Sequence, residues 1–377
     1  MKYFISDSKG KGNTYAILFA FLLSLFFCLI TSCSKKQPTE AVPSKILVLD
    51  NCDGGNTAAT ITQGDNVLIL DPNCRLLKKI TGFKVKDGSS KQKAISASED
   101  GRYFSVCEDA VNRLSIYETS TGGEYKSIIW PGRKENSAIF FKDKIYAINQ
   151  TGTLAIDFKK GSYKEVNTFW YGPCYDFVFD SKHNCVWIVG QTITKYSMDF
   201  KTLFEVNSVF DISKALAFSV DITSDGSIWI AVKEIYEQNG PGNKLVKISL
   251  DGNIIETIPL EAAPACICVD KSDNSIWVTG MASNKDYMKI DDEWPETLSE
   301  LHQAIETDIK TFTHKYNSVG RLIAELDKGG YSICIDSSDK SVWIGSYDSI
   351  IHCSGSGDII GEYDDVSKRQ KWITIVK

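Results

Sequence analysis

The side chains that could carry acid–base or metal chemistry are few and scattered. The chain has four histidines, and none belongs to a His/Glu or Cys/His ligand motif; they are His183, His302, His314 and His352. Catalytic and metal sites need such groups to converge on one point. The sequence also lacks a Gly-x-Ser-x-Gly nucleophile motif, a phosphate-binding loop and a dinucleotide fingerprint. We therefore predict no catalytic residue, no cofactor and no metal site.

The clearest chemical signal is Cys33. Basic residues precede an apolar run over residues 15–30, and small residues follow it up to Cys33. This order is typical of a secretory signal peptide, and the run is shorter than the about 20 residues that span a bilayer. The motif Ile30-Thr31-Ser32-Cys33 resembles the lipobox of bacterial lipoproteins. The resemblance implies that residues 1–32 are removed and that Cys33 is acylated, by palmitate among other chains, and anchors the protein to a membrane.

The residues after Cys33 predict a tether. Residues 33–44 are polar and contain two prolines, a composition typical of a flexible linker. No aspartate directly follows Cys33. By resemblance to the sorting rule of some Gram-negative lipoproteins, this favours the outer membrane and leaves the leaflet open. We expect a location in the cell envelope.

Charge and cysteine content limit which class of protein this chain can belong to. The formal net charge is −6, and removing the signal peptide, with its three lysines and one aspartate, would make it −8. An acidic chain without a basic run does not suit nucleic acid, because phosphates are bound largely by Lys and Arg. Nine cysteines follow Cys33 without a zinc-type spacing. We expect most of them to be buried thiols rather than disulfides.

A repeated phrase predicts the fold. An apolar strand, a polar turn with Asp, and Val/Ile-Trp-Ile/Val occur at residues 177–190, 224–232, 266–280 and 332–346, with weaker copies at 96–106 and 138–148. The aromatic anchors are spaced by 42, 41, 42, 48 and 66 residues; they are Phe104, Tyr146, Trp187, Trp229, Trp277 and Trp343. A period near forty, with about four strands a copy, is typical of a β-propeller. We expect the anchors to pack between blades, and Asp225, Asp273 and Asp339 to stabilise turns.

We predict one all-β domain over residues 45–377, a propeller of seven four-stranded blades, with six or eight as alternatives. The blades are expected at residues 45–83, 92–130, 136–170, 173–210, 224–260, 266–326 and 331–366. Residues 372–376 read as one more strand, which we expect to complete the first blade and remove a free edge. Whether residues 45–50 are then an inner or a second strand stays open.

One insertion, residues 281–310, interrupts the sixth blade. Pro295 and an apolar stripe predict a short helix there; the stripe is Leu298, Leu301, Ile305 and Ile309. The helix either lies back on the propeller or caps one mouth of the channel for a partner or ligand.

The blade sequences resemble those of streptogramin lyase (virginiamycin B lyase) and NHL-like propellers, and also the Trp-Ile-Gly blades of two-component regulator sensors. The phrases that carry the resemblance are DGSIWIAV, NKLVKISLDGNIIETIPL and KSVWIGSYDSIIHCSGSGDIIGEY, and it covers residues 92–366. It implies the propeller architecture. The lyase family is also implied to use a metal ion with His and Glu near one end of the channel, a set that this chain does not match.

Two functions follow. The first is a lipid-anchored, non-enzymatic scaffold in the cell envelope that binds a protein or carbohydrate partner. The alternative is a metal-dependent lyase or lactonase on the same frame, with inner-strand carboxylates such as Asp176 or Asp221 as ligands. His314 and His352, in adjacent blades, are the histidines expected to approach each other. The absence of a convergent His/Glu set favours the scaffold.

Overall fold

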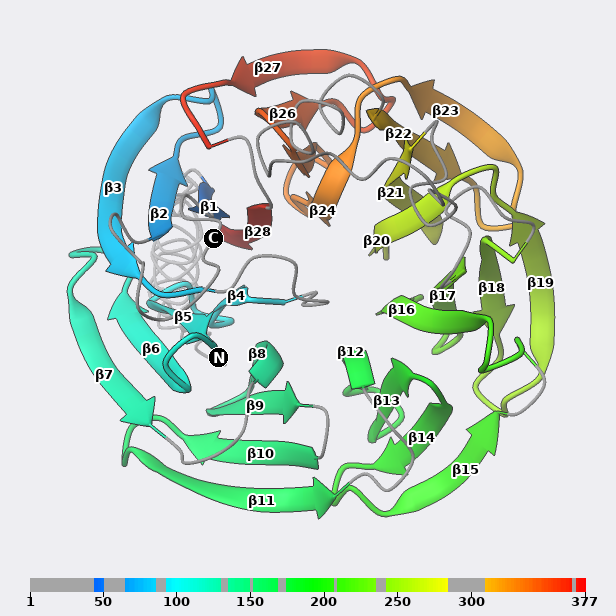
Figure 1. Ribbon diagram of the computed structural model, residues 1–377, viewed down its shortest axis with the longest axis horizontal. Coiled ribbons are helices and arrows are strands. Elements are labelled where there is room, and N and C mark those ends of the chain that lie inside the picture. The colour runs from blue at the N-terminus through cyan, green and yellow to red at the C-terminus, as the bar shows by residue number, and fades with distance from the viewer. Residues whose placement is uncertain are drawn as a thin grey trace, which may run out of the picture. The chain divides into compact units, whose positions relative to one another are not determined.

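The computed structural model describes residues 44–50, 65–85, 93–129, 135–149, 152–168, 174–206, 209–234, 242–283, 309–367 and 371–377. Residues from Ser44 onward form one compact unit. It consists of seven four-stranded antiparallel sheets arranged in a ring, which confirms the predicted seven-bladed propeller (Figure 1). The predicted signal peptide, Cys33, Cys52 and the predicted helix as far as Ile305 lie outside the described residues. Ile309, which we placed on the apolar stripe of that helix, is instead the first residue of a strand, because the sheet of the sixth blade extends into the insertion. No helix capable of spanning a bilayer occurs in the part of the chain that the structure describes.

The first four blades follow one another along the chain, and in each the strands run in order from the channel to the outer surface. Blade 1 contains β28 (Lys371–Val376), β1 (Lys45–Asp50), β2 (Asp65–Leu70) and β3 (Leu76–Phe83). Blade 2 contains β4 (Ile95–Ala97), β5 (Tyr103–Glu108), β6 (Arg113–Glu118) and β7 (Glu124–Ile129). Blade 3 contains β8 (Glu135–Phe141), β9 (Lys144–Asn149), β10 (Gly152–Asp157) and β11 (Ser162–Thr168). Blade 4 contains β12 (Cys174–Asp180), β13 (Cys185–Gly190), β14 (Ile193–Ser197) and β15 (Thr202–Val206).

The last three blades have the same order. Blade 5 contains β16 (Ala215–Ile222), β17 (Ile228–Glu234), β18 (Lys244–Ile248) and β19 (Ile254–Pro259). Blade 6 contains β20 (Ala263–Asp270), β21 (Ser275–Ser283), β22 (Ile309–Tyr316) and β23 (Leu322–Leu326). Blade 7 contains β24 (Gly330–Ile335), β25 (Val342–Ser346), β26 (Ile350–Cys353) and β27 (Ile359–Tyr363). Because β21 and β22 extend into the predicted insertion, the non-repeat segment is residues 284–308 rather than 281–310.

The two rims of the ring differ in their connections. At the turn rim, short turns join the inner to the second strand and the third to the outer strand. There Asp225, Asp273 and Asp339 each accept a backbone N–H from two residues further on, at 2.8–3.0 Å, which confirms their predicted role. At the loop rim, the chain passes from second to third strands and from one blade to the next. The segment 284–308 joins the ring at this loop rim.

Closure of the ring is confirmed. β28 pairs with β1 over its whole length, from Lys45 opposite Val376 to Asp50 opposite Lys371. Residues 45–50 are therefore the second strand of blade 1. Trp372 is 1% exposed and packs with the core between blades 1 and 2.

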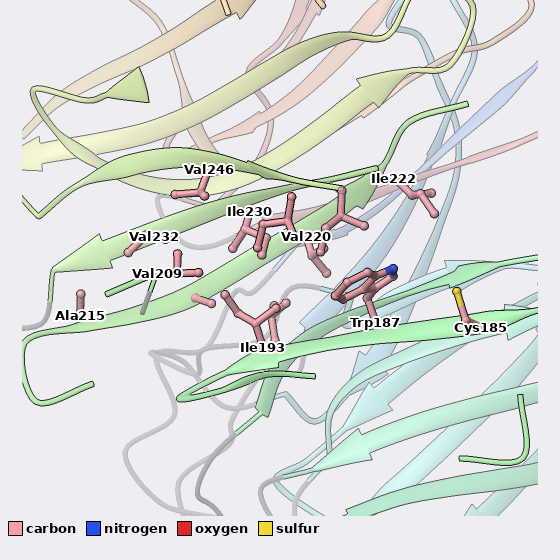
Figure 2. Packing of buried hydrophobic residues seen from close by; sticks show 14 residues of the cluster. Cys185, Trp187, Ile193, Val209, Ala215, Val220, Ile222, Ile230, Val232 and Val246 are labelled. Carbon is pink, nitrogen blue, oxygen red and sulfur yellow. The ribbon is translucent and has the colours of Figure 1, made fainter. Parts of the chain in front are cut away.

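The core consists of apolar layers between neighbouring blades. Trp187 and Cys185 of blade 4 face Val220 and Ile222 of blade 5 in the layer that Figure 2 shows. Trp229, Trp277 and Trp343 belong to the layers between blades 5 and 6, 6 and 7, and 7 and 1. All four tryptophans are at most 1% exposed, so their predicted packing role is confirmed.

Our alignment of Phe104 with the tryptophans is wrong by one residue. Phe104 packs backward against Leu47 and Val67 of blade 1. Its neighbour Tyr103 faces blade 3 and meets Phe158 at 5.4 Å between ring centroids. Successive residues of a strand point to opposite faces, so a shift of one residue reverses the assignment.

The eight described cysteines are thiols that form no disulfide with one another, which confirms the prediction for them. Six are buried and two half-buried: Cys74, Cys107, Cys174, Cys185, Cys266 and Cys353, then Cys268 and Cys334. Burial raises the pKa of seven of these thiols, all except Cys107, to about 11 for Cys266 and about 12 for Cys174. The reactive thiolate is therefore disfavoured at neutral pH.

We expect deletion of residues 371–377 to lower the melting temperature by roughly 10 °C or more, because it removes buried Trp372 and unpairs β1. Thermal unfolding followed by circular dichroism checks this. Deletion of the exposed Lys377 alone is the control and should cost little. A truncated protein that melts like the full chain would contradict closure through β28.

Candidate functional site

The central channel is lined by seven inner strands whose inner edges have no further strand to pair with. Backbone N–H groups left unpaired at such an edge cost free energy unless another acceptor reaches them. Side chains of the preceding blade supply that acceptor. Asp176 of blade 4 accepts the N–H of Val220 in blade 5 at 2.9 Å, and Asp221 accepts that of Val269 in blade 6 at 2.8 Å.

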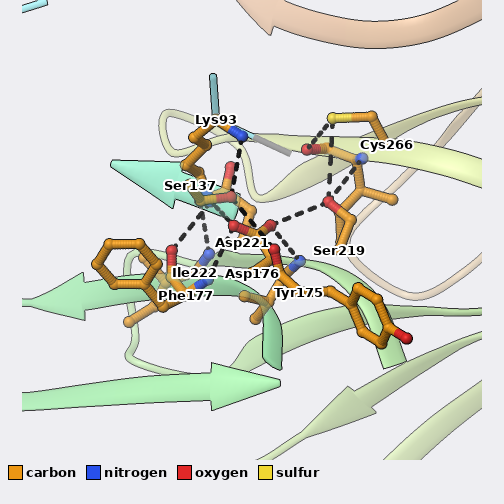
Figure 3. A network of polar contacts seen from close by, with 11 residues as sticks. Lys93, Ser137, Tyr175, Asp176, Phe177, Ser219, Asp221, Ile222 and Cys266 are labelled. Carbon is orange, nitrogen blue, oxygen red and sulfur yellow. Dashed lines mark hydrogen bonds and ion pairs between the residues drawn. The ribbon is translucent and has the colours of Figure 1, made fainter. Parts of the chain in front are cut away.

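Asp176 is the centre of the most connected polar cluster in the channel (Figure 3). It is 1% exposed, forms an ion pair with Lys93 of blade 2 and accepts the Ser219 hydroxyl at 3.2 Å. Lys93 also donates to the Phe177 carbonyl at 2.9 Å. Burial raises the pKa of Asp176, while Lys93 and the N–H groups of Val220 and Phe177 act in the opposite direction. The carboxylate thus links blades 2, 4 and 5.

Hydroxyls and thiols repeat the same bond around the ring. Ser219 accepts the N–H of Ile267 at 3.3 Å, and Ser96 accepts that of Phe140 at 3.2 Å. Backbone hydrogen bonds from Ile333 and Ile335 reach Cys266 and Cys268. The small polar residues of the inner strands are therefore structural acceptors between blades.

These hydrogen bonds give Asp176 and Asp221 a structural role at the blade junctions. Neither Asp176 nor Asp221 belongs to a ligand set, since no group of three His, Cys, Asp or Glu that could hold a metal occurs among the described residues. Three of the histidines are described. His183 lies in a turn, 2.6 Å from Asp180. His314 lies 3.4 Å from Glu325, and His352 stacks on Trp343 at 3.9 Å, so each has its own neighbour.

A second repeated contact joins the blades nearer the turn rim. Each tryptophan of blades 4–6 lies opposite a lysine of the third strand, in the pairs Trp187–Lys195, Trp229–Lys247 and Trp277–Lys315. The ammonium groups lie 5.2–5.6 Å from the indole centroids. Each also donates to a turn carbonyl of the next blade: Leu250 at 2.7 Å, Ser318 at 3.2 Å and Gly355 at 2.7 Å. We call this lysine-to-carbonyl bond the latch.

Three other junctions use variants of the latch. In blades 1 and 2 the lysine comes from the outer strand: Lys78 donates to Thr121 of blade 2, and Lys126 donates to Lys159 of blade 3 at 2.7 Å. In blade 7, His352 takes the place of the lysine opposite Trp343. Its side chain contacts the backbone of Pro72 in blade 1 through a hydrogen bond.

The junction between blades 3 and 4 has a groove instead. Its volume is about 520 Å³. Blade 3 contributes one wall and the turn of blade 4 at residues 197–201 the other. The lining residues are Lys144, Tyr146, Ala155, Asp157, Ser162, Tyr163, Lys164, Glu165, Val166, Met198, Asp199 and Phe200.

Sequence reasoning missed both the latch and the groove. A usable signal was present, because the latch residue stands two places before the polar residue that opens the turn in Lys195-Tyr-Ser, Lys247-Ile-Ser, Lys315-Tyr-Asn and His352-Cys-Ser. Recognising a latch also needs the carbonyl across the junction, which belongs to another repeat.

No family model and no curated protein matches the sequence. Solved structures are similar in fold. Hydrazine synthase of Kuenenia stuttgartiensis has 13% identity and a TM-score of 0.56, with 73% of this chain and 80% of that chain covered. Streptogramin B lyase has 18% identity and a TM-score of 0.53, over 75% and 85% of the two chains. A functionally unknown protein from Desulfotomaculum acetoxidans DSM 771 has 11% identity and a TM-score of 0.58, over 89% and 99%. At these identities the likeness shows the propeller fold alone.

We expect Lys315→Met to lower the free energy of unfolding by about 1–3 kcal/mol, because it removes a charged hydrogen bond and a cation–π contact while keeping the aliphatic stem. Denaturant titration measures the change. Lys271→Met, at an exposed turn position of the same blade, is the matched control and should be nearly neutral. Equal stability of the two variants would contradict the latch.

Proposed function

We propose that this protein is a lipid-anchored β-propeller of the cell envelope that acts as a non-enzymatic scaffold for a protein or carbohydrate partner. One observation carries the proposal: the channel carboxylates that a lyase would use as ligands serve as acceptors for backbone N–H groups of the next blade. The groove between blades 3 and 4 supports it further, because it is a concave surface whose lining includes the charged side chains of Lys144, Lys164 and Asp199.

The anchoring half of the proposal rests on Cys33 and on where the domain begins. β1 starts at Lys45, on the turn rim. The tether, residues 34–43, spans at most about 35 Å when extended. An acylated Cys33 would thus hold the start of β1 within this distance of the membrane.

We expect the full-length protein, expressed in a bacterium that processes lipoproteins, to incorporate an alkyne-labelled palmitate and to sediment with membranes. Cys33→Ala should abolish labelling, because the acylated thiol is lost. Cys28→Ala is the matched control, since this cysteine lies within the apolar run of the signal. A Cys33→Ala protein that still carries the label, or an unlabelled wild type, refutes the anchor.

The non-enzymatic half is tested by metal binding. A ligand that binds only the folded state at 100 times its dissociation constant adds about 2.7 kcal/mol of stability. We expect millimolar Ca²⁺, Mg²⁺, Mn²⁺ or Zn²⁺ to leave the melting temperature at its value in EDTA. A rise of several degrees with one ion, lost in Asp176→Asn or Asp221→Asn, would instead support the metal-dependent lyase or lactonase.

A further inference from the structure

The inner strands of blades 3–7 share a β-bulge near the loop rim. At the same place in each strand, one residue is skipped in the pairing with the second strand; these residues are Asn136, Tyr175, Phe218, Ala265 and Tyr331. A bulge leaves its extra residue without a cross-strand partner and changes the direction of its side chain, and bulges are frequent next to active sites. The repeat therefore places one such residue per blade at the loop-rim mouth of the channel.

The bulged side chains leave the packed layers between blades. Tyr175, Phe218, Ala265 and Tyr331 are half-buried, whereas both chain neighbours of each are buried. No further strand lies beyond the inner strands of the sheets, so the open space beside them is the channel. The bulges therefore turn these side chains toward the mouth of the channel.

Two neighbouring blades place aromatic rings at this position. The rings of Tyr175 and Phe218 lie 5.5 Å apart between centroids and are tilted by 39°. Figure 3 shows the Tyr175 ring directed away from the carboxylate of Asp176, so the ring lies outside that polar cluster. Blade 6 has only Ala265 at the equivalent position. The mouth thus has an aromatic side, formed by blades 4 and 5, next to the small side chain of blade 6.

Lys233 adds an unpaired positive charge to this side of the mouth. It lies near the end of β17, and its ammonium is 5.2 Å from the centroid of the Phe218 ring. It has no ion pair and no hydrogen bond with any residue that the structure describes. Burial lowers the pKa of Lys233, and no neighbouring carboxylate acts in the opposite direction. Its charge is therefore compensated only by the face of one aromatic ring.

The repeat shows that the fold does not require a lysine here. Lys233 stands four residues after Trp229; the equivalent residues of blades 4, 6 and 7 are Gln191, Met281 and Tyr347. Lysines with a structural role in this ring reach an acceptor, as Lys93 does at Asp176. Lys233 is half-buried and reaches none in the described part of the chain. Because an unpaired cation is costly to remove from water, we expect it to meet an anion that the chain itself does not supply.

We propose that the mouth of the channel at Lys233 binds a carboxylate carried on a flat or apolar ring. The Lys233 ammonium can only donate and a carboxylate can only accept, so the two charges compensate each other where water is partly excluded. The rings of Tyr175 and Phe218 offer apolar faces to the ring of the ligand. A benzoate-type acid and the uronic acid of a glycan share this chemistry. The inference rests on the proposed scaffold function and names the ligand class that its channel would hold.

The same groups disfavour other ligand classes. A cation would be repelled by Lys233, and a neutral ring would leave its ammonium unpaired. A phosphate ester carries up to two negative charges at neutral pH, and one ammonium compensates only one of them. Lys93, which also reaches the channel, is already paired with Asp176. The mouth therefore suits a ligand with a single negative charge.

The test is a titration of the mature lipidated chain in detergent, followed by ligand-observed NMR. The probes are two carboxylates, benzoate and methyl β-glucuronide, and their neutral counterparts of similar shape, benzamide and methyl β-glucoside. We expect at least one carboxylate to bind, and to bind at least tenfold more tightly than its neutral counterpart, because the latter lacks the hydrogen bond between charged groups. The carboxylate that binds identifies the source of the ligand.

Variants of the mouth assign the binding to Lys233. Lys233→Gln should weaken it at least tenfold. The melting temperature should not fall, because relief of the buried charge offsets the lost contact with Phe218. Lys233→Arg keeps the charge and should retain binding. Lys214→Gln is the matched control, since this lysine of the same blade and rim is 71% exposed, and affinity should be unchanged. If Lys233→Gln folds poorly, Tyr175→Ala should weaken the same binding severalfold.

Three results would overturn the inference. They are that neither carboxylate binds, that a neutral counterpart or phenyl phosphate binds as tightly as the carboxylate, or that Lys233→Gln binds the carboxylate as the wild type does. The palmitate labelling and the metal titration do not depend on Lys233. Failure of the carboxylate site can therefore be distinguished from failure of the scaffold itself.

Discussion

The fold depends on the unpaired inner edge of every blade. An isolated four-stranded sheet would leave a row of backbone N–H groups facing the channel. In the ring, the preceding blade supplies a carboxylate, hydroxyl or thiol for them, as Asp221 does for Val269 and Ser219 for Ile267. A blade is complete only with its neighbour in place, so the ring behaves as one cooperative body. The same bonds explain why the inner strands carry small polar side chains, which serve as acceptors for the next blade.

A second consequence of the repeat is that a blade junction that departs from the common pattern is easily identified. Lysines and a histidine cross the other junctions, whereas Ala155 stands opposite Tyr146 between blades 3 and 4. At the same junction Phe200 takes a backbone conformation for which five other blades use glycine. Two independent departures from the pattern meet at one groove. These two departures distinguish the junction between blades 3 and 4 from the other junctions of the described ring.

Much of this architecture could be read from the sequence because it is local and repeated. The Val/Ile-Trp-Ile/Val phrase located the second strands, the turn aspartates marked the turn rim, and an unpartnered last strand predicted closure. Relations between repeats could not be predicted in this way. The acceptor for Lys195 is a carbonyl 55 residues away. The donor to Asp176 is a backbone N–H, and because nearly every residue has one, the sequence does not indicate which of them is bonded. Phe104 was misaligned because one residue of shift exchanges the two faces of a strand.

The pairing of β28 with β1 has a bearing on how the protein is made. The first strand of the domain is synthesised early, yet its partner is among the last residues of the chain. Blade 1 can therefore be completed only after the strands of the other six blades have been synthesised. This pairing has the largest sequence separation of the described strand pairs, and contacts of large separation carry a large loop-closure cost in folding.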